Sequence, residues 1–164
     1  MSPARAWLVP VGALRRHSGS AREVEIHAPL PGMAITYARV PDESAVSFKG
    51  KVTSTVGGVV VDGTAQARYE GECRRCLEEA SGELVVAVRE VCLDHPDPEL
   101  GYGVEPDWLD LEPIVHDACI LELPLAPLCR EACQGLCPEC GVNRNNEACS
   151  CAVRLEHNGS DVAT

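Results

Sequence analysis

The sequence predicts a mostly β fold of the α+β class, in which an antiparallel meander or a partly open barrel is covered by one helix and followed by a cysteine-rich C-terminal segment. Three observations predict it. Apolar and polar residues alternate with a period of two through much of residues 44–92, a 3.6-residue period appears only after residue 110, and cysteines gather beyond residue 127. The 164 residues suit one domain with a small appendage.

The first half of the chain is expected to form strands. Short extended pieces are expected between the prolines, at residues 7–11, 23–28 and 34–40. From residue 46 to residue 53 the alternation is typical of a strand with one buried face. Gly-Gly at 57–58 predicts a turn. Asp-Gly at 62–63, a strong hairpin dipeptide, predicts that one strand ends there and another occupies residues 64–72.

The second half predicts one further strand and one helix. The strand is expected at residues 84–92, and the acidic residues, prolines and glycines of 94–109 predict an exposed loop. Asp110 is expected to cap a helix that tolerates Pro113 in its first turn and is stopped by Pro124. The apolar face of this helix would then close over the meander.

These patterns divide the chain into a β-rich core domain with one helix at residues 1–127, a cysteine-rich segment at 128–151 and a flexible tail at 152–164. The apolar run at 7–14 contains a proline and a glycine and leads into basic residues, so it is a poor signal peptide. No other stretch approaches the roughly 18 to 20 apolar residues of a membrane span. A cytoplasmic location is therefore expected, where thiols stay reduced and clustered cysteines bind metal more often than they form disulfides.

Most of the ten cysteines are spaced for a metal. A structural zinc takes four ligands at the corners of a tetrahedron, which places neighbouring sulfurs roughly 3.8 Å apart. Two residues between paired cysteines allow a tight turn to deliver that spacing, and this pattern occurs at 73/76 and 137/140. Combining the second pair with the cysteines at 149 and 151 predicts a closed zinc-binding knuckle, site B, formed by Cys137, Cys140, Cys149 and Cys151.

The pairs that remain suggest a second zinc site, site A, formed by Cys73, Cys76, Cys129 and Cys133. An alternative joins Cys129 or Cys133 to the pair at 137/140 and leaves the pair at 73/76 free. About two zinc ions per chain are expected, since a structural site holds one ion in four ligands. Cys92 and Cys119 occupy apolar positions of a strand and a helix and are expected to be ordinary buried thiols.

The charge distribution bears on possible partners. Residues 1–75 carry a net charge of +3 and residues 76–164 a net charge of −14, which together give −11. Because phosphate neutralisation drives sequence-independent binding to nucleic acids, an acidic chain favours a basic protein partner. A direct RNA contact through Arg15, Arg16, Arg74 and Arg75 is an alternative. Arg15 and Arg16 could equally form a solvated turn, and Arg74 and Arg75 could equally offset the negative charge of the neighbouring thiolates.

Catalysis is not expected. All-cysteine zinc sites are closed, whereas catalytic zinc keeps an open position and uses histidine or carboxylate ligands. A thiol redox enzyme would place its Cys-x-x-Cys at the start of a helix after a strand, but the pair at 73/76 lies between two predicted strands.

Four segments together form a recognisable combination. They are Glu72-Cys73-Arg74-Arg75-Cys76-Leu77, Asp110-Leu111 opening a helix that runs into 121–129, Gly135-Leu136-Cys137-Pro138-Glu139-Cys140-Gly141, and the N-terminal arginine cluster with Gly19-Ser20. In this combination the chain resembles the YceD family. The resemblance spans roughly residues 7–151, and it maps the family's cysteine pair and C-terminal cysteine cluster onto the eight residues of sites A and B. One departure is Glu122, in a stretch that is more uniformly apolar in the family.

The resemblance implies a role in the accumulation of 23S ribosomal RNA, and hence in assembly of the large ribosomal subunit, in bacteria and chloroplasts. We therefore expect a non-catalytic assembly factor that binds a basic ribosomal protein or a large-subunit precursor particle. Neither a membrane nor a small-molecule substrate is expected.

Overall fold

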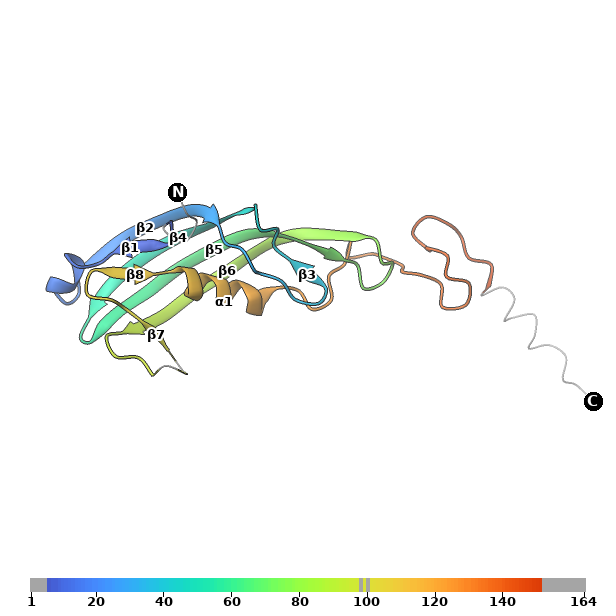
Figure 1. Cartoon of the computed structure of the whole chain (residues 1–164). Helices are drawn as coiled ribbons and strands as arrows, with labels where there is room; N and C mark the ends of the chain where they lie inside the picture. Colours follow the sequence, from blue (N-terminus) through green and yellow to red (C-terminus); the bar gives the residue numbers. More distant parts are fainter. Residues whose placement is uncertain (1–5, 98, 100, 152–164) are drawn as a thin grey trace, which may run out of the picture.

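The computed structural model describes residues 6–97, 99 and 101–151, and the predicted tail at 152–164 lies outside the described residues. In Figure 1 long strands lie side by side, and a helix runs along them. In chain order the elements are β1 (Leu8–Pro10), the 3-10 turn η2 (Leu14–Arg16), β2 (Ala21–Pro29), β3 (Ala38–Arg39), β4 (Ala45–Thr55), β5 (Gly58–Glu72), β6 (Glu79–Leu93), β7 (Tyr102–Gly103), β8 (Trp108–Asp110) and α1 (Glu112–Glu122).

The long strands β4, β5 and β6 form the antiparallel meander that the sequence predicts. Strand β2 pairs with the other edge of β4, β7 runs parallel to the end of β6, and β3 pairs with β5 near Gly71. The sheet order is β2-β4-β5-β6-β7, so the sheet is open. A separate two-stranded ribbon joins β1 to β8.

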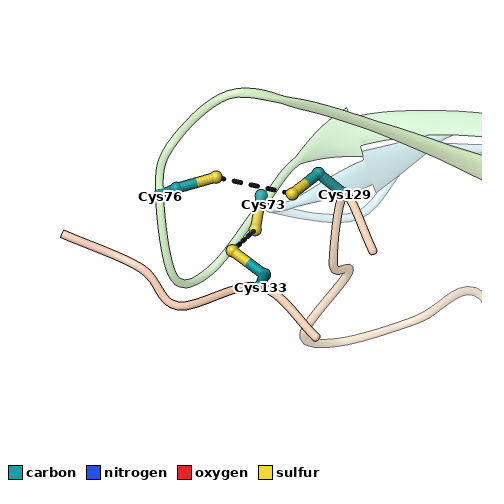
Figure 2. A group of neighbouring side chains, drawn as sticks. All are labelled: Cys73, Cys76, Cys129 and Cys133. Atoms are coloured by element: carbon teal, nitrogen blue, oxygen red, sulfur yellow. Dashed lines mark hydrogen bonds between the residues drawn. The ribbon is translucent and has the colours of Figure 1, made fainter. Parts of the chain in front are cut away.

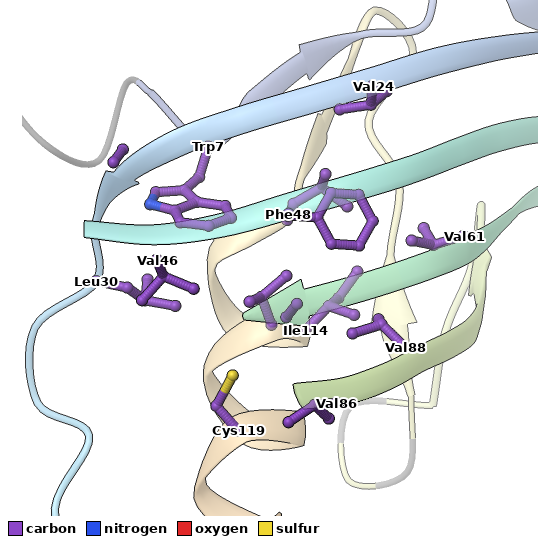
Figure 3. Packing of buried hydrophobic residues seen from close by; sticks show 14 of the residues in the cluster. Trp7, Val24, Leu30, Val46, Phe48, Val61, Val86, Val88, Ile114 and Cys119 are labelled. Atoms are coloured by element: carbon purple, nitrogen blue, oxygen red, sulfur yellow. The ribbon is translucent and has the colours of Figure 1, made fainter. Parts of the chain in front are cut away.

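The core lies between one face of the sheet and the layer formed by α1 and its neighbours. Side chains of β4 alternate between buried and partly or fully exposed, and Val46 and Phe48 on the inner face are fully buried. Ile114 and Cys119 on α1 point into the same core, as Figure 3 shows. Trp7, just before β1, is fully buried beside them, and its Nε1 donates a hydrogen bond to the carbonyl oxygen of Pro29 at 3.1 Å.

The hairpin expected at residues 62–63 is wrong, because β5 continues through both positions. Gly63 faces Gly50 across the β4–β5 pair. A Cβ atom on Gly63 would lie 2.7 Å from the Lys49 carbonyl oxygen, and one on Gly50 would lie 2.4 Å from the Asp62 carbonyl oxygen. Either added Cβ would also come within 3.0 Å of the Phe48 ring, so the two glycines allow the strands to pack closely around it. The true turn follows β4, where Gly57 has φ +81°.

Two other expectations change in detail. The segment at 94–109 holds β7 and the start of β8, and Val104 and Leu109 are buried, so it is more than an exposed loop. Within the extended piece at 34–40, β3 pairs with β5, and the Tyr37 carbonyl oxygen just before it accepts the backbone N–H of Glu72 at 3.3 Å.

The helix forms where the sequence places it. The Asp110 carboxylate accepts a hydrogen bond from the backbone N–H of Glu112 at 2.9 Å, and a proline occupies the first turn. Glu122 and Leu121 are both exposed at its end. Among the described residues, no helix has the length and apolar character needed to cross a membrane. Beyond α1 the chain runs toward the tip of the β5–β6 hairpin, which positions the cysteine-rich segment (Figure 1).

Candidate metal centre

Site A is assembled from two distant parts of the chain. Strand β5 ends at Glu72 and β6 begins at Glu79, so Cys73 and Cys76 occupy the turn at the tip of a long hairpin. The backbone N–H of Arg74 donates to the Pro127 carbonyl oxygen at 2.9 Å and draws the chain that leaves α1 against this turn. That contact brings the next cysteines of the chain to the hairpin tip.

The four sulfurs assigned to site A converge on one point, as Figure 2 shows. The Cys73 and Cys133 sulfurs lie 3.7 Å apart, and the Cys76 and Cys129 sulfurs lie 3.6 Å apart. All four lie within 4.8 Å of one another. The structure thus brings the cysteine pair at 73/76 together with the pair at 129/133, as predicted for site A. It does not match the alternative in which the pair at 73/76 is left free.

Site B gathers its four sulfurs within one short loop. The Cys140 and Cys149 sulfurs lie 3.7 Å apart and the Cys149 and Cys137 sulfurs 3.2 Å apart, and together with Cys151 all lie within 4.8 Å of one another. This group is more exposed than site A, because only Cys137 is buried.

Both Cys-x-x-Cys turns have the same backbone geometry. The N–H of Leu77 donates to the Cys73 carbonyl oxygen at 2.9 Å, and the N–H of Gly141 donates to the Cys137 carbonyl oxygen at 2.9 Å. Leu77 has φ +62° and Gly141 has φ +73°. Glycine adopts this region without strain, whereas the Cβ of leucine makes it costly. The turn at 73–77 therefore keeps the same shape as the one at 137–141 despite an unfavourable residue.

The donor set suits a tetrahedral metal ion. All ten cysteines are free thiols. Two sulfur pairs in each group lie 3.2–3.7 Å apart, and the other pairs lie within 4.8 Å. The shorter separations are far from the roughly 2.05 Å of a disulfide. They are close to the edge of a tetrahedron of sulfurs about a zinc ion, roughly 3.8 Å. The two cysteine tetrads can thus each hold a metal ion.

Hydrogen bonding favours the thiolate form of one cysteine in each tetrad, Cys73 and Cys137. The pKa of the Cys151 thiol is instead raised to about 12, chiefly by its hydrogen bond with Cys149, and that of Cys76 is also raised to about 12. Burial acts to raise the pKa of the Cys73 thiol, but hydrogen bonds from backbone N–H groups, including those of Cys129 and Arg75, outweigh it and lower this pKa to about 6. The backbone N–H of Cys140 is the largest cause that lowers the pKa of the Cys137 thiol, also to about 6. The thiolate is the form that ligates a metal.

Comparison with known proteins settles the family. A family model described as "Large ribosomal RNA subunit accumulation protein YceD" matches residues 61–159, a span that includes all eight cysteines of the two tetrads. The chain belongs to the YceD family. This agrees with the resemblance carried by its cysteine pair and by the residues around its helix.

Similar proteins are found in mycobacteria and in a plant. An uncharacterised protein of Mycobacterium tuberculosis is 34% identical over 144 residues, which cover 82% of this chain and 69% of that protein. An uncharacterised protein of Mycobacterium leprae is 36% identical over 101 residues, covering 57% of this chain and 46% of that protein. The "Large ribosomal RNA subunit accumulation protein YCED homolog 1, chloroplastic" of Arabidopsis thaliana is 29% identical over 63 residues, which cover 38% of this chain and 20% of that protein. No solved structure matches.

In this YceD-family chain the two arginine clusters lie apart. Arg15 forms an ion pair with Asp94 and donates to the Glu105 carbonyl oxygen at 2.8 Å, near the end of the sheet where β5 begins. Arg16 beside it is exposed. Because β5 runs the length of the sheet, the pair at 74/75 lies at the opposite end (Figure 1).

The second arginine pair is engaged with the protein itself. The guanidinium of Arg74 stacks over the Tyr37 ring, 3.8 Å from its centroid. Arg75 Nη1 donates to the Cys133 carbonyl oxygen at 3.0 Å and to that of Glu131 at 3.3 Å. Arg75 thus braces the chain that carries a site A cysteine.

Cys92 and Cys119 are fully buried in the main core and lie outside both tetrads. Burial raises the pKa of the Cys92 thiol to about 12 and that of the Cys119 thiol to about 11. Both therefore stay protonated and behave as apolar side chains, which agrees with their expected role.

Sequence reasoning missed the polar residues that support the tetrads. Asn145 Nδ2 donates to the Cys133 sulfur at 3.3 Å, although Asn145 belongs to the loop of site B. Asn143 and Asn146 donate through Nδ2 to the Glu78 carboxylate in the hairpin turn, at 2.9 Å and 3.2 Å. Three asparagines within four residues, between the cysteine pairs of site B, were the signal available in the sequence.

Proposed function

We propose that this chain is a non-catalytic, zinc-binding factor for assembly of the large ribosomal subunit and accumulation of 23S ribosomal RNA. It acts by binding a basic ribosomal protein or a precursor particle. Zinc is held by Cys73, Cys76, Cys129 and Cys133 in site A and by Cys137, Cys140, Cys149 and Cys151 in site B. When bound, each ion supplies a rigid tetrahedral crosslink and no reactive position.

The observation that carries this proposal is the family match, because it names accumulation of large ribosomal RNA and spans both tetrads. The donor chemistry supports a structural role for the metal, since four sulfurs close the coordination sphere of zinc and leave no place for a substrate. The net charge of −14 over residues 76–164 supports a basic partner. Four thiolates around each zinc would make this half more negative still.

The structure gives less support to the alternatives. A direct RNA-binding module would need its four arginines on one surface, but the two clusters lie at opposite ends of the sheet and Arg15 is paired with Asp94. A thiol redox enzyme would need Cys73 and Cys76 free to pair with each other. In the structure the Cys73 sulfur also contacts the Cys133 sulfur and the Cys76 sulfur also contacts the Cys129 sulfur. Four sulfurs gathered in this way suit the ligands of one metal ion better than a redox pair.

The test is recovery of ribosomal material from a bacterial host on the tagged full-length chain, after crosslinking and separation of particles by sedimentation. The native chain is expected to recover large-subunit precursors or a basic large-subunit protein, and to carry about two zinc ions by elemental analysis. Replacing Cys76 and Cys129 by serine should abolish site A and lower recovery, while Cys119→Ala should leave the zinc content unchanged. A chain that holds zinc but recovers no ribosomal component would contradict the role in assembly. A chain purified without metal under reducing conditions would contradict the zinc.

A further inference from the structure

The loop that carries site B is bound to the turn that carries site A. Asn143 and Asn146 both donate to one oxygen of Glu78, two residues beyond Cys76. The turn of site A therefore receives, at the exposed Glu78 carboxylate, two amide hydrogen bonds from the segment between Cys140 and Cys149.

Asn145 lies in that segment and contacts a ligand of the other tetrad. One hydrogen of its amide group points to the Cys133 sulfur at 3.3 Å and another to the Asn143 side-chain oxygen at 2.8 Å. Its own oxygen accepts the backbone N–H of Gln134 at 2.8 Å. The side chain thereby fixes both the sulfur of Cys133 and the backbone of the next residue.

The short chain between the tetrads is held from both sides. The N–H of Leu136 donates to the Arg75 carbonyl oxygen at 2.9 Å, and the N–H of Arg144 donates to the Gly135 carbonyl oxygen at 2.9 Å. Gly135 has φ +72°, and a Cβ there would lie 2.8 Å from the Arg75 oxygen. Only glycine allows this approach without strain. The chain from Gln134 to Leu136 is thus fixed between the hairpin tip and the site B loop.

Groups that hydrogen-bond a metal ligand orient it and strengthen the site, and their loss typically costs about 10- to 100-fold in metal affinity. Here such a group sits on a loop whose own shape depends on the cysteines at its two ends. Apolar packing around site A is small, consisting of Ala80 with the partly buried Leu128 and Leu136 in addition to the sulfurs. The hydrogen bonds of the loop are therefore a large share of what positions Cys133.

We propose that the two tetrads bind metal cooperatively, and that Asn145 is the positioning residue through which metal at site B strengthens metal binding at site A. The inference rests on the proposed zinc binding and goes beyond it. Zinc at site B fixes the loop from Cys140 to Cys149, the ordered loop holds Asn145 against Cys133, and the held sulfur is ready for its ion. By reciprocity, metal at site A strengthens site B by the same factor.

The experiment measures zinc affinity in the full-length chain by competition with a chromophoric chelator under reducing conditions. Single-site chains provide the reference: Cys140→Ser with Cys149→Ser leaves site A, and Cys76→Ser with Cys129→Ser leaves site B. The product of the two affinities of the intact chain is compared with the product of the single-site affinities. We expect a ratio of about ten or more, because a supporting hydrogen bond to a ligand is worth at least that in metal affinity.

The same comparison on Asn145→Ala should bring this ratio close to one. Arg144→Ala is the matched control, since it changes an exposed neighbour in the same loop, and it should keep the ratio of the native chain. Circular dichroism of each chain checks that the β-rich core is intact.

Two outcomes would overturn the inference alone. One is a ratio near one in the intact chain, with both sites filled, which means that the tetrads bind independently. The other is a high ratio that persists in Asn145→Ala, which means that coupling takes another route. A chain in which neither tetrad binds zinc would instead contradict the proposed function on which the inference rests.

Discussion

Removing the metal is expected to unfold residues 128–151 while the sheet stays folded. The main core is built from the sheet, Trp7 and α1, whereas the cysteine-rich segment packs in a separate small cluster. In that cluster Leu128 and Leu136 can contribute at most about 1.5–3 kcal/mol each by burial. Ordering a residue costs about 1–2 kcal/mol for its backbone alone. The apolar contacts thus offset the ordering of only about four residues, and the remainder of the segment needs the metal.

The assay is amide hydrogen exchange with and without a strong chelator, under reducing conditions. The N–H of Leu136, bonded to the Arg75 oxygen, and the N–H of Cys137, bonded to the Val142 oxygen, should lose protection and exchange nearly as fast as in an unfolded peptide. Amides of β4 and β5 should keep their protection. Protection that survives in the 128–151 segment after the metal is gone, or is lost equally in β4, would refute the reasoning.

Three other predictions concern packing and thiol chemistry. Gly63→Ala places a Cβ 2.7 Å from the Lys49 oxygen and should destabilise the protein by about 1–3 kcal/mol, measured by urea unfolding. In the control Gly101→Ala the added Cβ meets nothing nearer than 3.8 Å, so stability should change by less than about 0.5 kcal/mol. Equal effects of the two substitutions would contradict the packing argument. Trp7→Ala should lower the free energy of unfolding by about 3–5 kcal/mol. Trp7→Phe should lower it less, because both variants lose the hydrogen bond to Pro29 but phenylalanine keeps an aromatic ring in the core. A cost below about 1 kcal/mol for Trp7→Ala would show that the core closes without the indole. At pH 8, mass spectrometry after alkylation of metal-free protein should find the eight tetrad thiols modified, because the segment that covers them unfolds with loss of the metal. Cys92 and Cys119 should stay unmodified until denaturant is added, because both are fully buried in the main core, where burial also raises the pKa of their thiols. Early labelling of either would show that the core is open.

The sequence predicts those parts of the fold that depend on local pattern. The alternation around Phe48 places β4 and its buried face correctly, and the period after Asp110 places α1. Prediction from the sequence fails where a neighbouring strand of the sheet, and not the local pattern, decides the structure. Asp62-Gly63 has the composition of a hairpin turn, but its glycine is required by Gly50 on the neighbouring strand. Strand β8 is missed because its pairing with β1 joins residues that are about a hundred positions apart.

The candidate site shows the same division. The sulfurs of site B share one short loop, so cysteine spacing alone groups them. Site A joins Cys76 to Cys129 across fifty-three positions. The sequence predicts it only by elimination, from the cysteine pairs that site B does not use. The role of Asn145 could not be deduced from spacing, because its contact with Cys133 depends on how the loop folds back. Leu77 likewise gives no sign in the sequence of the positive φ that it adopts.

The bridge between Cys76 and Cys129 has a consequence for the order in which the chain folds. An ion held there would tie strands β6, β7 and β8 and the helix into a single ring, closed by coordination bonds. A ring of this size removes about 4 kcal/mol of chain entropy from the unfolded ensemble, by the relation used for disulfide loops. If zinc binds early, the unfolded chain has fewer conformations to sample before α1 packs against the sheet. Refolding should therefore be faster when the ion is present from the start.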